Sequence, residues 1–244
     1  MPDSIAAASR IAVIDEPFVP GGAFASIDIV AADAVSSPSA TAEDSRHALH
    51  ADERALAETM SPTRRASFVA GRRALRAAVR HVAPDLETYS LLRTHRGAPN
   101  LPVGVTGSIS HKRTRAIAVA AAHDGMQVGV DLEERPGERD LSRPSIADRI
   151  LTEFERDAIS ALDPLPHREA TLVRFALKEA VYKSIDPYVE RYVRFTEVEL
   201  DVHVDGRATV RLLLPELGTN DVILNAHWRI EDRWIIAMAS SARA

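Results

Sequence analysis

The chain has 244 residues and a formal net charge of −5, and 27 of its 30 basic residues are Arg. It contains no cysteine, which excludes disulfides, thiolate metal sites and cysteine nucleophiles and agrees with a cytoplasmic location. The longest aliphatic run, residues 116–122, is far shorter than the ~20 residues of a membrane helix, and the first residues lack a signal-peptide pattern.

The first half of the sequence mixes short apolar segments with one long helical pattern. Apolar segments at 11–14 and 24–30 precede a stretch rich in Ser, Ala and Pro that is typical of a loop. A helical pattern begins at Ala51, and a second helix is expected to begin with Ser61 as N-cap and Pro62 at its first position. Pro84 ends that helix. Residues 105–110 and 115–122 are predicted strands.

The second half is predicted to begin with a strand, continue with two helices and end in hairpins. The strand covers residues 128–132, and Pro136 and Pro144 bracket the loop after it. The helices are expected at 146–162 and 168–185, the second stopped by Asp186-Pro187. The hairpins join 198–204 to 208–214 and 226–230 to 233–239.

Two segments of the chain resemble each other. Residues 68–79 read FVAGRRALRAAV and residues 175–185 read FALKEAVYKSI, and each is followed by a hairpin-like segment. This similarity predicts an α+β fold of two related halves, residues 1–122 and 123–244, with a ligand site between them.

The strand VGVDLEE, residues 128–134, ends in paired carboxylates. Asp131 and Glu133 are two apart, so they project from the same side of a strand. A solvated sheet edge explains such a pair when it stands alone. The apolar residues before it indicate a buried strand, in which two converging carboxylates favour a hard cation such as Mg²⁺ between them.

The segment RFALKEAVYKS, residues 174–184, holds Glu179 and Lys183 four apart on one helical face. The simpler interpretation is a surface ion pair worth ~0.3–0.5 kcal/mol. The apolar surroundings also allow Glu179 to be a third metal ligand, with Lys178 and Lys183 supplying positive charge beside it.

The helix at 61–82 carries six Arg residues and no acidic residue. These arginines either pair with acids elsewhere in the chain or bind phosphate groups of a nucleotide or nucleic acid. The segment RGAPNLPVGVTGSISH, residues 96–111, adds Gly104 and Gly107, which permit close backbone approach, and the polar Ser110 and His111.

In this order, the four segments resemble the 4′-phosphopantetheinyl transferases of the surfactin- and enterobactin-synthetase type. The matching motifs are GRRALR, GSISH, GVDLE and FALKEAVYK, and the likeness runs from about Arg64 to Lys183. Phe175 stands where part of the family has Trp, and Lys112 where one branch often has Cys. We have no role for Lys112.

The resemblance implies two α+β halves in a pseudo-twofold relation and a Mg²⁺-dependent transfer, with Mn²⁺ as an alternative metal. The phosphopantetheine arm of coenzyme A would move to a serine of an apo acyl or peptidyl carrier protein, an acidic helical domain, with release of 3′,5′-ADP. The implied metal ligands are Asp131, Glu133 and Glu179. The implied catalytic residues are Glu179, Lys183 and His111.

The resemblance also implies the coenzyme A contacts, which are Arg64, Arg72, Arg96, Ser110, His111, Lys178 and Lys183. It predicts a monomer that binds neither nucleic acid nor membranes. Because the carrier is acidic, a basic docking surface is expected, and its candidate residues are Arg135, Arg139, Arg143 and Arg149. Two alternatives remain open: a Mg²⁺-dependent hydrolase of nucleotides or coenzyme A, and a nucleic-acid-binding module that uses the Arg helix.

Overall fold

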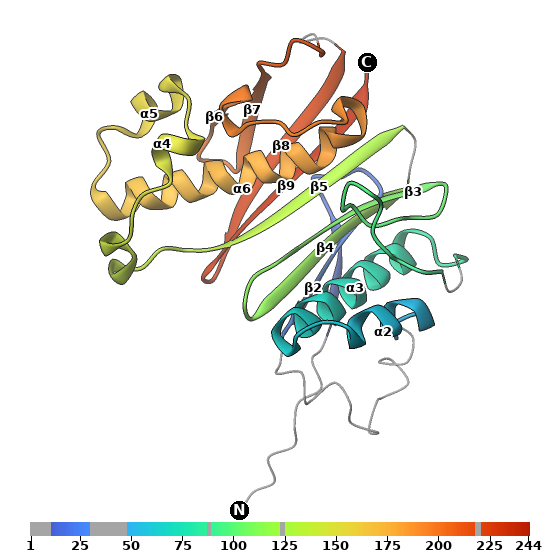
Figure 1. Cartoon of the computed structure of the whole chain (residues 1–244). Coiled ribbons are helices and arrows are strands. Elements are labelled where there is room, and N and C mark those ends of the chain that lie inside the picture. The colour runs from blue at the N-terminus through green and yellow to red at the C-terminus, as the bar shows by residue number, and fades with distance from the viewer. Residues whose placement is uncertain (1–10, 30–47, 87–88, 123–124, 218–220) are drawn as a thin grey trace, which may run out of the picture. The chain divides into compact units, whose positions relative to one another are not determined.

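The computed structural model describes residues 11–29, 48–86, 89–122, 125–217 and 221–244. Contacts between Cα atoms divide the chain into two units, residues 1–123 and 124–244. Each unit combines one antiparallel sheet with one long helix (Figure 1), so the fold is α+β, as predicted. No helix in the described part of the chain is long and apolar enough to cross a membrane.

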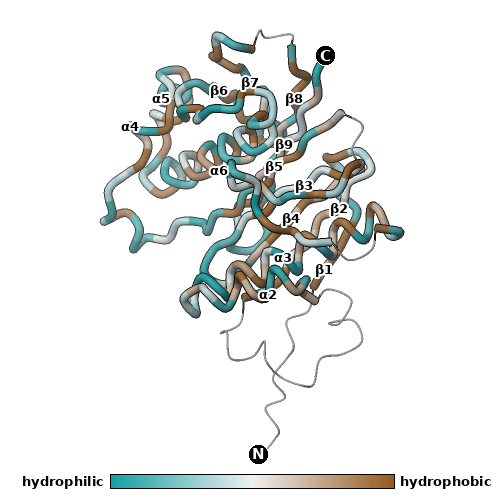
Figure 2. Tube along the Cα trace, turned by 45° about the vertical axis from the view of Figure 1, so that its right-hand side comes forward, coloured by the Kyte–Doolittle hydropathy of each residue, from teal (hydrophilic) through white to brown (hydrophobic). Residues whose placement is uncertain are grey.

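The first unit has a four-stranded sheet in the order β1-β2-β4-β3. Its elements are β1 (Ile11–Glu16), β2 (Gly22–Asp28), α2 (Ala51–Glu58), α3 (Pro62–Val82), β3 (Val105–His111) and β4 (Arg115–Ala122). The helix α3 begins at Pro62, as predicted, and packs on the sheet through a stripe of buried residues that includes Ala74, Leu75 and Ala78. The strand β4 is hydrophobic along most of its length (Figure 2).

The second unit has a five-stranded sheet in the order β5-β9-β8-β7-β6. Its elements are β5 (Met126–Glu134), η2 (Glu138–Ser142), α4 (Ala147–Ile150), α5 (Glu153–Ile159), α6 (Pro164–Val189), η3 (Phe195–Glu197), β6 (Val198–Val202), β7 (Arg207–Leu212), β8 (Val222–Glu231) and β9 (Trp234–Arg243). Both predicted hairpins are present, and positive φ angles at Gly206 and Asp232 form their turns.

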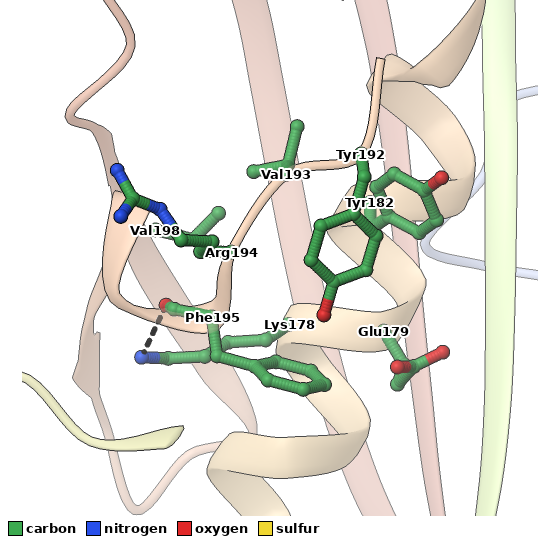
Figure 3. A pocket seen from close by; sticks show the side chains of 8 residues that line it. All are labelled: Lys178, Glu179, Tyr182, Tyr192, Val193, Arg194, Phe195 and Val198. Carbon is green, nitrogen blue, oxygen red and sulfur yellow. Dashed lines mark hydrogen bonds between the residues drawn. The ribbon is translucent and has the colours of Figure 1, made fainter. Parts of the chain in front are cut away.

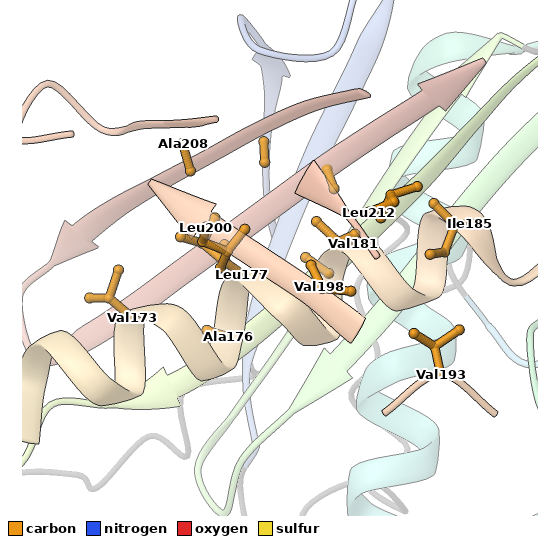
Figure 4. Packing of buried hydrophobic residues seen from close by; sticks show 14 of the residues in the cluster. Val173, Ala176, Leu177, Val181, Ile185, Val193, Val198, Leu200, Ala208 and Leu212 are labelled. Carbon is orange, nitrogen blue, oxygen red and sulfur yellow. The ribbon is translucent and has the colours of Figure 1, made fainter. Parts of the chain in front are cut away.

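The core of the second unit lies between α6 and the sheet (Figure 4). Leu177, Val181 and Ile185 of α6 are fully buried against residues of β6, β7 and β9. Complete burial of such a side chain stabilises the fold by roughly 1.5–3 kcal/mol. This contact fixes the orientation of α6 on the sheet, and so the direction in which its candidate site residues project.

The prediction of one helix over residues 146–162 was wrong. The chain forms α4, turns into an extended conformation at Leu151 and starts α5 at Glu153. A capping box causes the new start: Glu155 N–H donates to the Thr152 hydroxyl (3.3 Å), and Thr152 N–H donates to the Glu155 carboxylate (2.7 Å).

The predicted end of the next helix at Asp186-Pro187 was also wrong, because α6 runs through Pro187 to Val189. A proline so close to the end of a helix removes only one backbone hydrogen bond. The hydroxyl of Tyr188 shares its one proton between the carbonyls of Gly125 (3.2 Å) and Ser241 (3.3 Å), which holds this last turn against the residue before β5 and against β9. Glu190, at φ 51°, ends the helix.

Candidate active site

Asp131 and Glu133 lie on the face of β5 that α6 covers. Gly129, two residues before Asp131, marks this face, because a Cβ placed there would lie 1.9 Å from the carbonyl oxygen of Ala180 in α6. Side chains alternate along a strand, so Asp131 and Glu133 project in the same direction as Gly129. Both are buried, with 6% and 8% of their surface exposed. The carboxylates therefore end a buried strand, as the sequence indicated.

Lys183 of α6 connects the two elements. Its Nζ donates to Asp131 Oδ1 at 2.8 Å and to the carbonyl oxygen of Val130 at 2.9 Å. Glu179 lies one helical turn before Lys183, on the same side of α6, and is half-buried. The structure thus joins Asp131 to Lys183 and places Glu179 on the helix that packs against the carboxylate strand.

The carboxylates of Asp131, Glu133 and Glu179 suit a hard cation by their chemistry, because Mg²⁺ takes oxygen ligands and carboxylates first among them. Among the described residues, however, no group of three His, Asp or Glu side chains is gathered as a metal site requires. In this structure the Lys183 ammonium group places a positive charge next to Asp131. The three carboxylates are thus chemically suited to Mg²⁺, and their role as its ligands stays a prediction.

Lys178 lies in a place that does not match the predicted contact with phosphates. Its side chain is 1% exposed, and its Nζ donates to Glu155 Oε2 (2.6 Å) and to the carbonyl oxygens of Ile150 (2.7 Å) and Phe195 (3.0 Å). Burial lowers the pKa of the ammonium group, and the hydrogen bond to Glu155 opposes this effect. Because an ammonium has three donors, these partners leave none for a ligand.

A pocket opens beside Glu179, between α6 and the segment that leads into β6 (Figure 3). It is lined by Lys178, Glu179, Tyr182, Tyr192, Val193, Arg194, Phe195 and Val198. The rings of Tyr182 and Tyr192 meet edge to face, with centroids 6.2 Å apart. The volume is about 30 Å³, room for roughly two water molecules. Tyr192 and Phe195 lie outside the four motifs, so the sequence did not predict them as pocket residues.

An ion-pair network holds the outer wall of this pocket. Arg191 donates to both Glu197 and Glu216, at distances of 2.7–3.1 Å. The backbone N–H of Arg194 donates to Glu197 at 2.8 Å. These bonds, the one from Arg191 above all, lower the pKa of Glu197 to about 2.

In the first unit, Arg72 is the most unusual of the predicted coenzyme A contacts. Its side chain is 5% exposed, and its Nε and Nη2 atoms are buried without a hydrogen-bond partner. The guanidinium carbon lies 4.8 Å from the ring centroid of Phe68. Burial, with Coulombic contributions from Arg93 and Arg76 that Glu53 opposes, lowers the pKa of Arg72 to about 10. A buried cation with unused donors is costly for folding unless an anion binds it.

The other predicted contacts of the first unit lie around α3 and β3. Arg64 is exposed in the first turn of α3, and Arg96 is exposed in the segment between α3 and β3. Ser110 is buried near the end of β3, and His111 is exposed as its last residue. A Cβ on Gly71, next to Arg72, would lie 2.9 Å from Ile109, so α3 runs close to this strand.

Arg65 and Arg76 of the Arg helix have partners within the fold. Arg65 donates to the carbonyls of Ala57, Glu58 and Met60. Arg76 forms a buried ion pair with Glu53 of α2, with 2.7 Å between Nη2 and Oε2. The first interpretation of the helix, arginines that pair with acids elsewhere, is therefore right for Arg76.

The Arg76 contact has a counterpart in the second unit. Glu53 binds the cation 23 residues later and accepts from the N–H of Leu91, and Glu155 binds Lys178, also 23 residues later, and accepts from the N–H of Leu200. Both glutamates belong to a capping box at a helix start. This repeat supports two similar halves. Its equivalent residues are 102 positions apart, whereas the alignment of 68–79 with 175–185 pairs residues 107 apart, so that alignment was off by five residues.

Comparison with known proteins decides the family. A model of the 4′-phosphopantetheinyl transferase superfamily matches residues 127–239, and one of the 4′-phosphopantetheinyl transferase N-terminal domain matches residues 52–121. The 4′-phosphopantetheinyl transferase Svp of Streptomyces mobaraensis is 33% identical over 172 residues, 68% of this chain and 67% of Svp. The chain belongs to the 4′-phosphopantetheinyl transferase superfamily.

Other proteins are similar to this chain over a larger or a smaller part of its length. The 4′-phosphopantetheinyl transferase Npt of Nocardia iowensis is 27% identical over 205 residues, 79% of this chain and 88% of Npt. Among solved structures, the ACPS–CoA complex of Chronobacterium ammoniagenes is 25% identical and covers 50% of this chain and 99% of its own, with a TM-score of 0.41. The prediction of a phosphopantetheinyl transferase from the four motifs is confirmed, and its narrower type stays a prediction.

Proposed function

We propose that this transferase moves the 4′-phosphopantetheine arm of coenzyme A to a serine of an apo acyl or peptidyl carrier protein, in the manner of the surfactin- and enterobactin-synthetase type. The observation that supports this most is the contact between β5 and α6. It brings Lys183 onto Asp131 on the strand face that also carries Glu133, with Glu179 one turn away.

In the proposed reaction, the serine oxygen of the carrier attacks the phosphorus that carries pantetheine. The bond from this phosphorus to the bridging oxygen breaks, and the bridging oxygen leaves with 3′,5′-ADP. Glu179 takes the serine proton, directly or through one water. Lys183 stabilises the negative charge that develops on the pyrophosphate oxygens.

We propose that Asp131, Glu133 and Glu179 hold Mg²⁺, or Mn²⁺ in its place. The ion would neutralise pyrophosphate charge during the transfer. Because Lys183 donates to Asp131 in this structure, an ion bound by Asp131 would share this carboxylate with the Lys183 ammonium group.

Coenzyme A recognition is assigned to residues of the first unit. Arg64 and Arg72 would bind the 3′-phosphate, Ser110 and His111 another phosphate, and Arg96 the nucleotide. Arg72 supports this best, because its buried Nε and Nη2 atoms have no partner in the fold and suit bidentate binding of a phosphate.

The carrier protein would dock near the basic residues between β5 and α6. All four candidate arginines are exposed, and two of them form ion pairs, Arg135 with Glu169 and Arg143 with Asp140. We expect alanine at Arg139 and Arg149 to raise the KM for an acidic carrier while the KM for coenzyme A stays unchanged.

The direct test is incubation of the protein with coenzyme A, Mg²⁺ and a small panel of apo carriers, followed by mass spectrometry of the carrier. Addition of one phosphopantetheine, absent when the carrier serine is replaced by Ala, is the expected result. Phosphopantetheine released into solution without a carrier would favour the hydrolase instead. Salt-sensitive DNA binding without affinity for coenzyme A would favour the nucleic-acid module.

A further inference from the structure

Glu155 and Lys178 together join four segments of the second unit. Lys178 of α6 donates to Glu155 of α5, to Ile150 at the end of α4 and to Phe195 at the start of η3. Glu155 Oε1 accepts from the N–H of Leu200 in β6 at 3.0 Å. One buried ion pair therefore holds α4, α5, η3 and β6 on a single position of α6.

This pair is not the arrangement that stability alone would favour. Both side chains are fully buried, at 1% and 0% exposure. Removing two charges from water carries a large penalty, and well-packed apolar residues of similar size are often as stable or more so. Compared with apolar residues, the ion pair fixes the position of each group to which it is hydrogen-bonded.

The groups held by the pair adjoin the candidate active site. Lys178 immediately precedes Glu179 on α6, and both line the same pocket. Across the pocket, the bond from Lys178 Nζ to the Phe195 carbonyl fixes the wall that carries the Phe195 ring and Val198 (Figure 3). The separation of this wall from Glu179 thus depends on Lys178.

The matching pair in the first unit shows which feature is particular to the second. There, Arg76 binds Glu53 and the carbonyl of Tyr89, and the Arg76 guanidinium stacks 5.7 Å from the Tyr89 ring centroid. In the second unit, three oxygens converge within 3.0 Å of one nitrogen. A compact ammonium fits three acceptors around one atom, and a planar guanidinium does not.

We propose that Glu155 and Lys178 are positioning residues for phosphopantetheine transfer, which set the distance between Glu179 and the pocket wall. This inference rests on the proposed function. It removes Lys178 from the direct phosphate contacts and gives Glu155, which no motif of the sequence singled out, a part in the reaction.

The test uses the double variant Glu155→Gln/Lys178→Met in the full-length protein, together with each single variant and Lys178→Arg. The double variant removes both charges, so it avoids the unpaired buried charge that destabilises each single variant. Val222→Ala, a buried truncation on β8 outside the pocket, is the control for lost stability. Transfer to an apo carrier is measured well below each melting temperature, and kcat and KM for coenzyme A are reported separately.

We expect the double variant to fold and to lose at least ~10-fold in kcat, because a displacement of about 1 Å at a reacting group costs up to ~100-fold. Its KM for coenzyme A should stay within about 3-fold, and Lys178→Arg should not restore kcat. Val222→Ala should keep the wild-type kcat.

A double variant with wild-type kcat overturns the proposal, as does a Lys178→Arg variant with wild-type kcat. If the double variant does not fold, Glu155→Gln, which keeps an oxygen acceptor, is judged by the same criterion. An inactive wild-type protein would instead contradict the proposed function, so the two failures are distinguishable.

Discussion

Lys183 of α6 donates a hydrogen bond to Asp131 of β5, with 2.8 Å between Nζ and Oδ1, and a second one to the carbonyl of Val130. The Lys183 side chain is 27% exposed and the Asp131 side chain is buried, so this contact lies at the edge of the buried helix–sheet interface. Partial exposure of the Lys183 side chain is what its proposed contact with a pyrophosphate would require.

Replacing Lys183 by Arg should damage transfer although the charge is kept. A guanidinium is larger, and its N–H donors are fixed in one plane, so it cannot take the position of the compact ammonium against Asp131 and Val130. We expect kcat to fall by about 100-fold, the order seen when one donor to a developing negative charge is removed. Steady-state kinetics measure this, and near-normal turnover would mean that Lys183 is only a solvated charge.

Glu179→Gln tests the base and the third ligand together. The amide keeps the size of the side chain but accepts no proton, so we expect turnover to fall at least ~100-fold in a folded protein. The control is Glu134→Gln, the same chemical change at an exposed residue of β5. Equal turnover in the two variants would place the metal and base elsewhere.

Gly129→Ala should separate α6 from β5. The added Cβ would lie 1.9 Å from the Ala180 carbonyl oxygen and 3.0 Å from the backbone nitrogen of Ser184, and neither backbone atom can turn away. We expect a large loss of stability by thermal denaturation, together with loss of transfer. Gly137→Ala is the matched control, because there the nearest atom is 3.9 Å from the new Cβ. Equal melting temperatures would contradict the close contact.

Arg72→Met should raise the melting temperature of the ligand-free protein and weaken coenzyme A binding. The apolar side chain avoids burying a cation with unused donors. Calorimetry with coenzyme A and with its analogue that lacks the 3′-phosphate separates the effects. We expect the variant to lose its preference for coenzyme A over the analogue. An unchanged preference would remove Arg72 from the 3′-phosphate site.

Acid should loosen the outer wall of the pocket. The pKa of Glu197 is lowered from 4.5 to about 2, chiefly by its hydrogen bond from Arg191. A lowered carboxylate pKa contributes stability that is present above about pH 4.5 and lost as the pH falls toward 2. Urea denaturation at pH 6 and pH 3 should show a smaller pH dependence in Glu197→Gln than in the wild type. The same dependence in both proteins would contradict this assignment.

Local chemistry made much of the fold predictable. Pro62 marked the start of α3, and Asp205-Gly206 marked a hairpin turn. Errors arose where tertiary contacts decide. The new helix starts at Glu153, where the capping box includes Glu155, whose buried carboxylate also binds Lys178 and the N–H of Leu200, 23 and 45 residues away.

The site could be predicted only as far as the motifs reach. The spacing of Asp131 and Glu133 gave their shared face, whereas the role of Lys178 depends on a carboxylate outside its motif. Only three of the 30 basic residues are Lys. Two of the three, Lys178 and Lys183, each make several hydrogen bonds from one nitrogen, which a compact ammonium does well.

The central claim is that the carboxylates of β5 and α6 bind the ion that transfer requires. Its most direct test is the transfer rate as a function of free Mg²⁺, measured for the wild type and for Glu133→Gln, with Glu134→Gln as the control. We predict no transfer without the metal and a half-saturating Mg²⁺ concentration at least ~10-fold higher in Glu133→Gln only, since one lost ligand is worth about 1.4 kcal/mol or more. Identical titration curves for all three proteins would contradict the claim.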